Sequence, residues 1–420
     1  MKNINILKNT PFTWTSWAPR IELSPEFFID GQKLKIMTNE NNYAYGKFLS
    51  GEISVSGPGI IIFEASFTCQ NVKNIEKSVF AMLSFYNGEK KLLERDYADI
   101  VVKNGVKKLY RKLDAPETAA YVILEIGLRY CANAVAEWDN ISLEFEPAEA
   151  MPHRIVRIAT TYKDPQDSPE KNLDDMIDVI NKAGKSNPDV ILLSELLYET
   201  CYNSGDKNVK SQPVPGPLTD KIGEYAKKYN TYIIFTMNER DGDIIYNTGV
   251  IIGRDGLICG KYRKTHLPLA EAEWGTSPGD THKVFDFDFG RVGIIICYDQ
   301  YFPENSRTLA LMGAGIIFIP TQGEDEIVQR AIARTNGVYV VVSGYQDPAH
   351  SRIINPLGEI INFVPDKNTA YAAEEIDLNK RFFVYWMSVG EGNGEIKDLF
   401  RKERNIETYG AINKESYDLR

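Results

Sequence analysis

The feature that most limits the fold of this chain is a change of hydrophobic pattern near residues 147–152. Before it, short apolar or alternating runs recur without helical spacing, and turn-forming pieces such as Asn87-Gly88 separate them. Strands at this spacing are typical of an antiparallel sandwich, so residues 1–148 are predicted to form an all-β, jelly-roll-like accessory domain. The predicted strands cover residues 32–37, 59–67, 78–86, 119–128 and 140–145.

After this change, strand-like apolar runs alternate with longer amphipathic stretches. Apolar runs of this kind are typical of buried strands in an α/β domain, which we expect over residues 149–420. The predicted strands are 190–193, 231–236, 248–252, 292–296, 315–319 and 338–342, and the predicted helices are 172–183, 220–229, 304–312 and 325–335.

Charge and cysteine content exclude several classes of protein. The 420 residues include 48 lysines and arginines against 58 aspartates and glutamates, a net charge of −10. Such an acidic chain is a poor candidate for binding nucleic acid or an anionic membrane. No apolar run approaches the roughly 20 residues of a membrane span, and residues 1–14 lack the apolar core of a secretion signal. The five scattered cysteines suggest no disulfide framework or paired metal spacing, so we expect a cytoplasmic protein.

Three predicted strand ends each carry a residue that can take part in chemistry. The run 190–194 leads directly into Glu195, the basic segment 260–268 contains Lys264, and the run 292–296 delivers Cys297 into a turn. Considered alone, each has an ordinary structural interpretation: a solvated glutamate, a surface lysine and an inert thiol. Considered together, they indicate one site assembled at strand ends.

The order and sequence context of these residues resemble the nitrilase, or carbon–nitrogen hydrolase, superfamily. The resemblance covers roughly residues 154–410. It implies a four-layer-type α-β-β-α sandwich, a Glu-Lys-Cys triad, and a homodimer or higher homo-oligomer. The late segment 400–410 resembles a family stretch that often crosses to a partner subunit. The matching segments are Tyr262-Arg263-Lys264-Thr265-His266-Leu267, Pro278-Gly279-Asp280, Gly290-Arg291-Val292-Gly293, Cys297-Tyr298-Asp299, Phe302-Pro303-Glu304, and the later stretches 330–340 and 351–359.

The family pattern gives each triad residue a role. A thiol is mostly protonated at neutral pH, and Glu195 would act as the base for Cys297. Lys264 and the backbone N–H of Tyr298 would stabilise the anionic tetrahedral intermediate. Water activated by Glu195 would then hydrolyse a thioester on Cys297. The prediction is a cysteine-dependent hydrolase of small non-peptide amides or N-carbamoyl amides, with no metal or organic cofactor.

Many members of the family carry a second glutamate between the lysine and the Pro-Gly turn. Glu271 and Glu273 both fit, and the distance to Pro278 favours Glu273 as the catalytic residue, with Glu271 assigned to substrate binding. Trp274 either lines the substrate pocket or packs the loop. His266 is expected to be structural, because it lies in no cysteine-protease signature.

The N-terminal domain lies outside the segment that resembles the hydrolase family, and its role stays open. The segment 138–143 resembles the last strand of galactose-binding-like or carbohydrate-binding sandwich modules, a likeness that covers about residues 10–146. This resemblance implies a glycan as a candidate further partner, but a structural or oligomer-shaping role is favoured over it. The candidate aromatic residues for stacking on sugar rings are Trp14, Trp17, Tyr43 and Tyr45.

Two alternatives to amide hydrolysis remain open. The same triad could transfer the acyl group to another amine, because a thioester can be intercepted, or it could hydrolyse a nitrile. A different class is a glycan-binding or scaffolding protein with a vestigial hydrolase domain. The intact set of Glu195, Lys264 and Cys297 argues against that second class.

Overall fold

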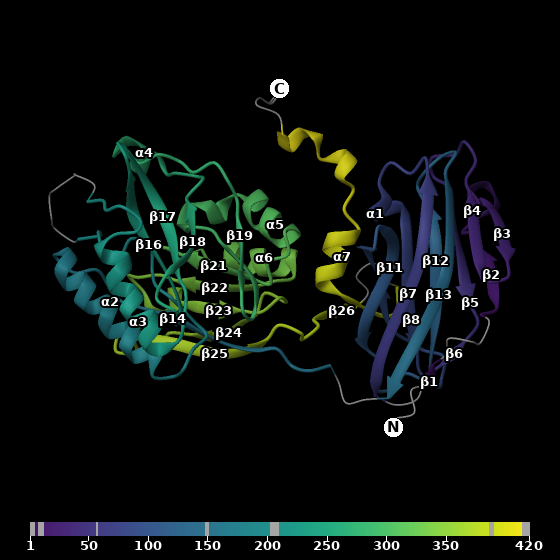
Figure 1. Cartoon of the computed structure of the whole chain (residues 1–420), viewed down its shortest axis with the longest axis horizontal. Helices are drawn as coiled ribbons and strands as arrows, with labels where there is room; N and C mark the ends of the chain where they lie inside the picture. Colours follow the sequence, from purple (N-terminus) through teal and green to yellow (C-terminus); the bar gives the residue numbers. More distant parts are fainter. Residues whose placement is uncertain are drawn as a thin grey trace. The chain divides into compact units, whose positions relative to one another are not determined.

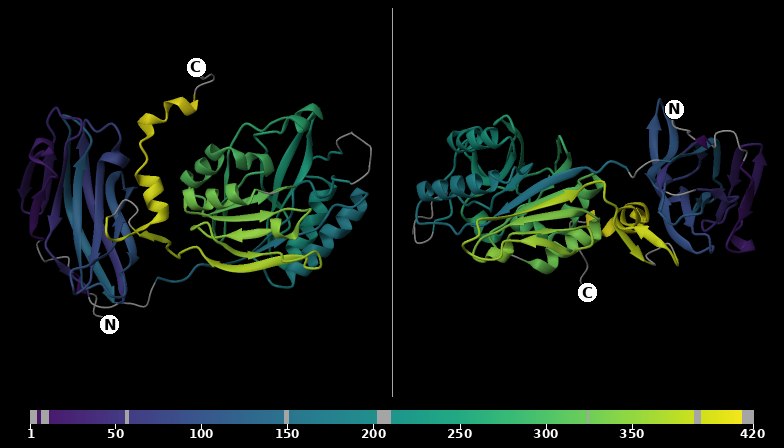
Figure 2. Two further views of the ribbon diagram at one scale, coloured as in Figure 1. Left: turned by 180° about the vertical axis from the view of Figure 1, so that it is seen from behind. Right: turned by 90° about the horizontal axis from the view of Figure 1, so that it is seen from below.

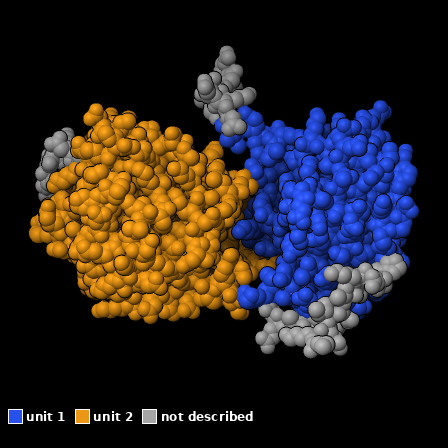
Figure 3. All heavy atoms as spheres, in the orientation of Figure 1, with its two compact units in different colours: residues 1–152, 383–420 blue, residues 153–382 orange. Residues whose placement is uncertain are grey.

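The computed structural model describes residues 5–6, 12–55, 58–147, 151–201, 210–323, 325–385 and 390–413. The chain forms two compact units, which Figure 3 shows in different colours. Unit 1 combines Met1–Pro152 with Phe383–Arg420, and unit 2 is His153–Phe382. The expected boundary at residues 148 and 149 lies outside the described residues. The sequence pattern assigned the C-terminal segment to the hydrolase domain, whereas its contacts group it with the front unit.

Unit 1 consists of two sheets that enclose one hydrophobic core (Figure 1). The first sheet has the order β10 (Asp99–Lys103), β11 (Val106–Asp114), β7 (Gly59–Gln70), β13 (Val135–Pro147), β4 (Lys33–Met37) and β3 (Glu26–Asp30), with β1 (Asn5–Ile6) paired to β13. The second has the order β2 (Trp14–Trp17), β5 (Tyr45–Ser50), β12 (Tyr121–Arg129), β8 (Val79–Tyr86), β9 (Leu92–Tyr97), β27 (Asn393–Glu395) and β26 (Phe383–Tyr385), with β6 (Ile53–Ser54) paired to β12. Burial alternates along β4 and β5, because a strand with one face in the core buries every second side chain.

The Asn-Gly pair after β8 marks a hairpin, as the sequence predicted. Strands β8 and β9 pair in antiparallel fashion, and residues 87–91 connect them. The side-chain oxygen of Asn87 accepts hydrogen bonds from the backbone N–H groups of Glu89 at 3.0 Å and Lys91 at 2.9 Å. This side-chain turn replaces the two-residue turn that Asn-Gly most often forms.

A segment near the C-terminal end of the chain packs against the strands of the front domain in unit 1 (Figure 2). Strand β27 extends the second sheet beyond β9 and is parallel to it. The helix α7 (Ile396–Lys402) follows, and its Leu399 packs against Phe80, Met82 and Tyr97. Sequence patterns do not reveal this pairing, because nearly 300 residues separate the two strands.

Unit 2 contains two six-stranded sheets, and a pair of helices covers each of them (Figure 1). The first sheet has the order β18 (Ile258–Arg263), β17 (Ile244–Ile252), β16 (Tyr232–Asp241), β15 (Val190–Leu192), β14 (Ile155–Thr161) and β25 (Tyr371–Asp377). The second has the order β19 (Val284–Phe287), β20 (Gly290–Ile294), β21 (Ile316–Pro320), β22 (Tyr339–Ser343), β23 (Arg352–Ile354) and β24 (Ile360–Phe363). The helices α2 (Pro169–Gly184) and α3 (Pro217–Tyr229) pack on the first sheet, and α5 (Pro303–Leu311) and α6 (Glu326–Asn336) on the second. The Ser343 hydroxyl joins the sheets by donating to the Thr161 carbonyl at 2.8 Å.

The predicted strands and helices of this half all have observed counterparts. Strands β16 and β17 extend past the predicted ends because they form a hairpin, whose turn places Gly242 at a φ of 61°. Ser168 and Asp325 cap α2 and α6 by accepting backbone N–H bonds in the first turn. Among the residues described, no helix has the length and apolarity needed to cross a membrane.

Candidate active site

The three residues singled out at strand ends come together in unit 2. Glu195 follows β15, Lys264 follows β18 directly, and Cys297 follows β20 as the first residue of a short 3-10 helix. Cys297 has a φ of 45°, a left-handed conformation that costs a non-glycine residue on the order of 1–3 kcal/mol. Such backbone strain concentrates at functional sites, where the surrounding structure maintains it.

Lys264 lies at the centre of a buried ionic cluster. Its Nζ is 2.9 Å from Oε1 of Glu195 and 2.6 Å from Oε1 of Glu271. The side chains of Lys264 and Glu195 are fully buried. Nδ2 of Asn247 also donates to the two glutamates, at 2.9 Å to Glu195 and 3.4 Å to Glu271. The cluster therefore contains one ammonium group within hydrogen-bond reach of two carboxylates.

The electrostatics of the cluster keep its cation charged and its thiol protonated. Burial alone would lower the pKa of Lys264, but the charges of Glu195, Cys297 and Glu271 raise it above its usual value. Burial raises the pKa of the Cys297 thiol, Glu195 raises it further, and Lys264 partly opposes them. Burial and the neighbouring Glu195 likewise raise the pKa of Glu271. The resting thiol therefore needs a base during attack.

The structure brings Glu271, and not Glu273, to Lys264. Both lie on the short helix α4 (Leu269–Glu273), where Glu271 is buried and Glu273 is exposed. Residues two apart on a helix point to nearly opposite sides, so only one of the pair can face the lysine. Sequence distance to the Pro-Gly turn favoured Glu273, but helical phase decides for Glu271.

Asp299 joins the nucleophile segment to the lysine segment. It is fully buried and lies two residues after Cys297. The hydroxyl of Tyr262 and the backbone N–H of Ile296 donate to its Oδ2. Its Oδ1 accepts from the backbone N–H of His266 at 2.9 Å, and this bond fixes the chain just after Lys264. His266 also has its ring Nδ1 3.1 Å from this oxygen, in agreement with a structural role.

The remaining predicted residues lie nearer the surface. Trp274 is the C-cap of α4 and is 58% exposed. Tyr298 is 37% exposed, and its ring packs against Tyr301 and Phe302. The backbone N–H of Tyr298 belongs to the first turn of the 3-10 helix, where N–H groups lack partners within the helix.

Asn247 is the site residue that sequence reasoning missed. It lies within β17, whose other residues read as an ordinary strand. The signal was in the register: Thr248 pairs with Arg263, so Asn247 is adjacent to Lys264 across the hairpin. A bulge between Ile251 and Ile252 shifts this register by one residue, so counting back from the turn at 253–257 would have paired Asn247 with Arg263 instead.

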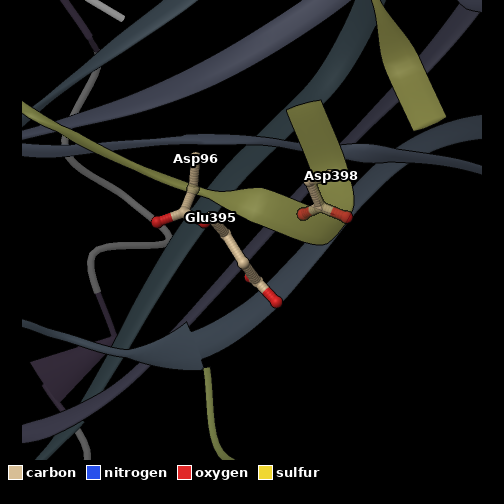
Figure 4. Close-up of side chains that lie close together, drawn as sticks. All are labelled: Asp96, Glu395 and Asp398. Carbon is tan, nitrogen blue, oxygen red and sulfur yellow. The ribbon is translucent and has the colours of Figure 1, made fainter. Parts of the chain in front are cut away.

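A second cluster of carboxylates lies in unit 1, where Asp96, Glu395 and Asp398 have oxygens within 4.8 Å of one another (Figure 4). Such a group can hold a metal ion. Here Nη2 of Arg111 is 2.9 Å from Asp96 and 2.8 Å from both Glu395 and Asp398. The arginine already supplies a cation to all three carboxylates, so we interpret the group as an ionic link between the β-sheets and the C-terminal segment.

Comparisons with known proteins match the part of the chain that carries Glu195, Lys264 and Cys297. A family model described as carbon–nitrogen hydrolase matches residues 157–381, more than half of the chain. A nitrilase of Pyrococcus abyssi is 33% identical over 275 residues, which cover 61% of this chain and 99% of that protein. The omega-amidase NIT2 of Homo sapiens is 32% identical over 229 residues, covering 48% and 81%.

Two further matches extend the comparison. The N-carbamoylputrescine amidase of Solanum lycopersicum is 28% identical over 264 residues, which cover 54% of this chain and 88% of that protein. The crystal structure of a carbon–nitrogen hydrolase from Helicobacter pylori G27 superposes with a TM-score of 0.50 at 21% identity, covering 62% of this chain and 99% of that one. The structural match concerns the fold alone.

Proposed function

The chain belongs to the carbon–nitrogen hydrolase family, and on this premise we propose that it cleaves small non-peptide amides or N-carbamoyl amides through a thioester on Cys297. The observation that carries the proposal is the buried Lys264 ammonium, which binds Glu195 and Glu271 and acts electrostatically on the Cys297 thiol. One site thereby combines a nucleophile, a base and a cation.

In the first half-reaction, Glu195 removes the thiol proton while the Cys297 sulfur attacks the carbonyl carbon. The carbonyl oxygen becomes an oxyanion, which Lys264 and the backbone N–H of Tyr298 stabilise. The tetrahedral intermediate then collapses, the carbon–nitrogen bond breaks, and protonated Glu195 gives its proton to the leaving ammonia or amine. The acyl group remains on Cys297 as a thioester.

In the second half-reaction, Glu195 deprotonates a water molecule that attacks the thioester carbonyl. The carbon–sulfur bond breaks, the carboxylic acid leaves, and the Cys297 sulfur recovers its proton from Glu195. Glu271 supports both steps by holding Lys264 in its charged form. We therefore assign the second glutamate to Glu271, with Glu273 outside the reacting groups.

The substrate class is supported by the names of the relatives. The omega-amidase and the N-carbamoylputrescine amidase favour an amide or ureido carbon–nitrogen bond. The nitrilase of Pyrococcus abyssi supports nitrile hydrolysis as the second candidate. Acyl transfer to an amine is a third fate of the same thioester.

A substrate panel tests this proposal. Purified protein would be incubated with aliphatic amides, N-carbamoyl amides and nitriles, and ammonia and the carboxylic product would be measured. We expect turnover of at least one amide or N-carbamoyl compound, and loss of turnover in Cys297→Ala with an unchanged circular dichroism spectrum. Ammonia release that survives in Cys297→Ala would contradict the proposal.

For unit 1 we propose a galactose-binding-like module that takes a glycan. Two of the four candidate aromatics are exposed, Tyr43 at 73% and Trp17 at 38%. Trp14 packs against the core between the sheets, and Tyr45 packs against the cluster of Phe80, Met82, Tyr97 and Leu399 on the other face of the second sheet. Tyr43 lines a cavity of about 600 Å³ together with Tyr130. The same cavity is lined by side-chain amides, which can bond sugar hydroxyls: Asn42, Asn71, Asn74 and Asn405.

Calorimetric titration of the whole protein with a saccharide panel tests the glycan proposal. Binding of one saccharide that is lost in Tyr43→Ala, with hydrolase activity retained, is the expected result. Equal heats from Tyr43→Ala and the unaltered protein would contradict it.

We further propose that two copies pair through α5 and α6, so that the helical layer over the second sheet of one copy packs against the same layer of the other. Exposed apolar residues on these helices and at their ends support it: Ile327 is 82% exposed, Met312 39% and Leu311 38%. Light scattering should give the mass of a dimer for the unaltered protein and the mass of a monomer for Ile327→Glu.

We also propose that the protein works in the cytoplasm. The five cysteines are all free thiols, which supports this compartment.

A further inference from the structure

The amide of Asn247 makes the two oxygens of Glu195 unequal. We infer that Asn247 is a positioning residue, which holds one oxygen of Glu195 so that the other is left to exchange protons with Cys297. This inference deepens the proposed function and rests on it.

Asn247 is placed for this by its own strand. It is 1% exposed in β17, and its carbonyl accepts the backbone N–H of Lys264 at 2.8 Å. Its Nδ2 donates to Oε1 of Glu195 at 2.9 Å and reaches Oε2 of Glu271 at 3.4 Å. Because both partners are carboxylates, only the nitrogen end of the amide can face them. One residue therefore fixes the lysine backbone and both glutamate side chains.

The two carboxylate oxygens of Glu195 differ in their hydrogen-bond partners. Oε1 receives two donors, Nδ2 of Asn247 and Nζ of Lys264, each at 2.9 Å. Oε2 is buried and has no hydrogen-bond partner among the described residues. A buried carboxylate oxygen without a hydrogen-bond partner is costly to fold, and it has its lone pairs free to accept a donor from outside the cluster. The charge of Glu195 raises the pKa of the Cys297 thiol, so the two groups interact electrostatically.

Asn247 is uncharged, and this neutrality suits a position between two carboxylates. The cluster already holds two carboxylates against one ammonium, so a third acid would repel Glu195 and Glu271. A second cation would stabilise the charged form of Glu195 and weaken it as a base. An amide supplies two N–H donors and, because it is neutral, leaves the net charge of the cluster unchanged.

Asn247→Leu and Asn247→Asp test the inference by kinetics. Leucine removes the donor at similar size, and Asp keeps the shape but exchanges the donor for an acid. We expect each variant at pH 7 to lose about 100-fold in kcat with little change in KM, because the base is misplaced and not the substrate. A matched control is Asn362→Leu, which removes an amide that donates to Glu374 at 3.1 Å on strands that carry no site residue. Its kcat should stay unchanged.

The pH dependence separates positioning from mere structural support. As pH falls, an Asp at 247 becomes protonated and regains a donor for Glu195, so the activity of Asn247→Asp relative to the unaltered protein should rise. The ratio for Asn247→Leu should stay flat. Alkylation of Cys297 by iodoacetamide, followed by mass spectrometry of its peptide, should show the same two patterns without a substrate.

The outcomes distinguish this inference from the proposed function. Active Asn247→Leu and Asn247→Asp variants beside an inactive Cys297→Ala would overturn the positioning role alone. Activity in Cys297→Ala would overturn the proposed function. A flat ratio in Asn247→Asp would contradict the role even if kcat fell, because lost folding does not recover at lower pH.

Discussion

The carboxylate of Asp299, two residues after Cys297, accepts the backbone N–H of His266, two residues after Lys264, at 2.9 Å. The nucleophile and the lysine come from different sheets of unit 2, so this bond sets their spacing. Asp299 is fully buried and takes further bonds from Tyr262 and Ile296. We predict that Asp299→Asn lowers the free energy of unfolding by about 2–4 kcal/mol and kcat by at least about tenfold.

Urea unfolding and steady-state kinetics measure the two effects of Asp299→Asn. Asp288→Asn is the matched control, since Asp288 is 54% exposed and bonds the Arg254 guanidinium at the surface. The control should change stability by less than about 0.5 kcal/mol. Equal behaviour of the two variants would show that Asp299 does not set the spacing.

The charges beside Cys297 predict opposite shifts of its thiol pKa. Burial raises this pKa, Glu195 raises it further and Lys264 lowers it. Glu195→Gln should therefore lower the thiol pKa, and Lys264→Met should raise it. Ultraviolet titration of thiolate absorbance, with the signal of the matching variant in a Cys297→Ala background subtracted, measures both. Shifts in the same direction would contradict the assigned arrangement of charges.

Glu239 forms hydrogen bonds with Lys261 and Arg263 of β18, the strand that directly precedes Lys264. Burial alone would raise its pKa, but bonds from Arg263, Lys261 and Thr248 lower it to about 2. A depressed pKa contributes stability above the unfolded-state value near 4.5, and the contribution is lost as pH falls toward 2. Glu239→Gln should thus cost about 3 kcal/mol at pH 7 and clearly less at pH 3. Urea unfolding at the two pH values checks this, and a cost that grows on acidification would be inconsistent with it.

Arg111 links the C-terminal segment to the sheets of unit 1. It forms ion pairs with four carboxylates, those of Asp96, Asp99, Glu395 and Asp398, and burial raises the pKa of Asp398, with Arg111 opposing. Arg111→Leu should lower the stability of the segment by about 3–5 kcal/mol, because it leaves buried acids without this cation. Hydrogen exchange of α7 measures the loss, and Lys35→Ala, which breaks an exposed pair with Glu137, should have no effect. Unchanged exchange in Arg111→Leu would refute the link.

The sequence was sufficient for features that depend on local pattern. Apolar runs predicted the strands that precede Glu195 and Cys297, because buried strands need continuous apolar residues. The order of glutamate, lysine and cysteine then predicted the site. Features that depend on register or helical phase could not be read in this way: Asn247 was not singled out, and Glu273 was preferred although Glu271 is the residue that bonds Lys264.

The C-terminal segment was beyond sequence reasoning for a different reason. Its strand β27 is three residues long and pairs with β9, hundreds of residues earlier. A short strand carries almost no pattern, and its position depends on buried charges contributed by Arg111 and Asp96. Its grouping with the front unit could be seen only in three dimensions.

The most direct test of the account is the mass of the Cys297 peptide during turnover. The protein would be mixed with a hydrolysed amide, quenched in acid within the first turnovers and digested. We predict a peptide containing Cys297 that is heavier by the acyl group of the substrate, and that loses this mass when hydroxylamine is added before the quench. Turnover with an unmodified Cys297 peptide, or the acyl group on another residue, would contradict the proposed mechanism.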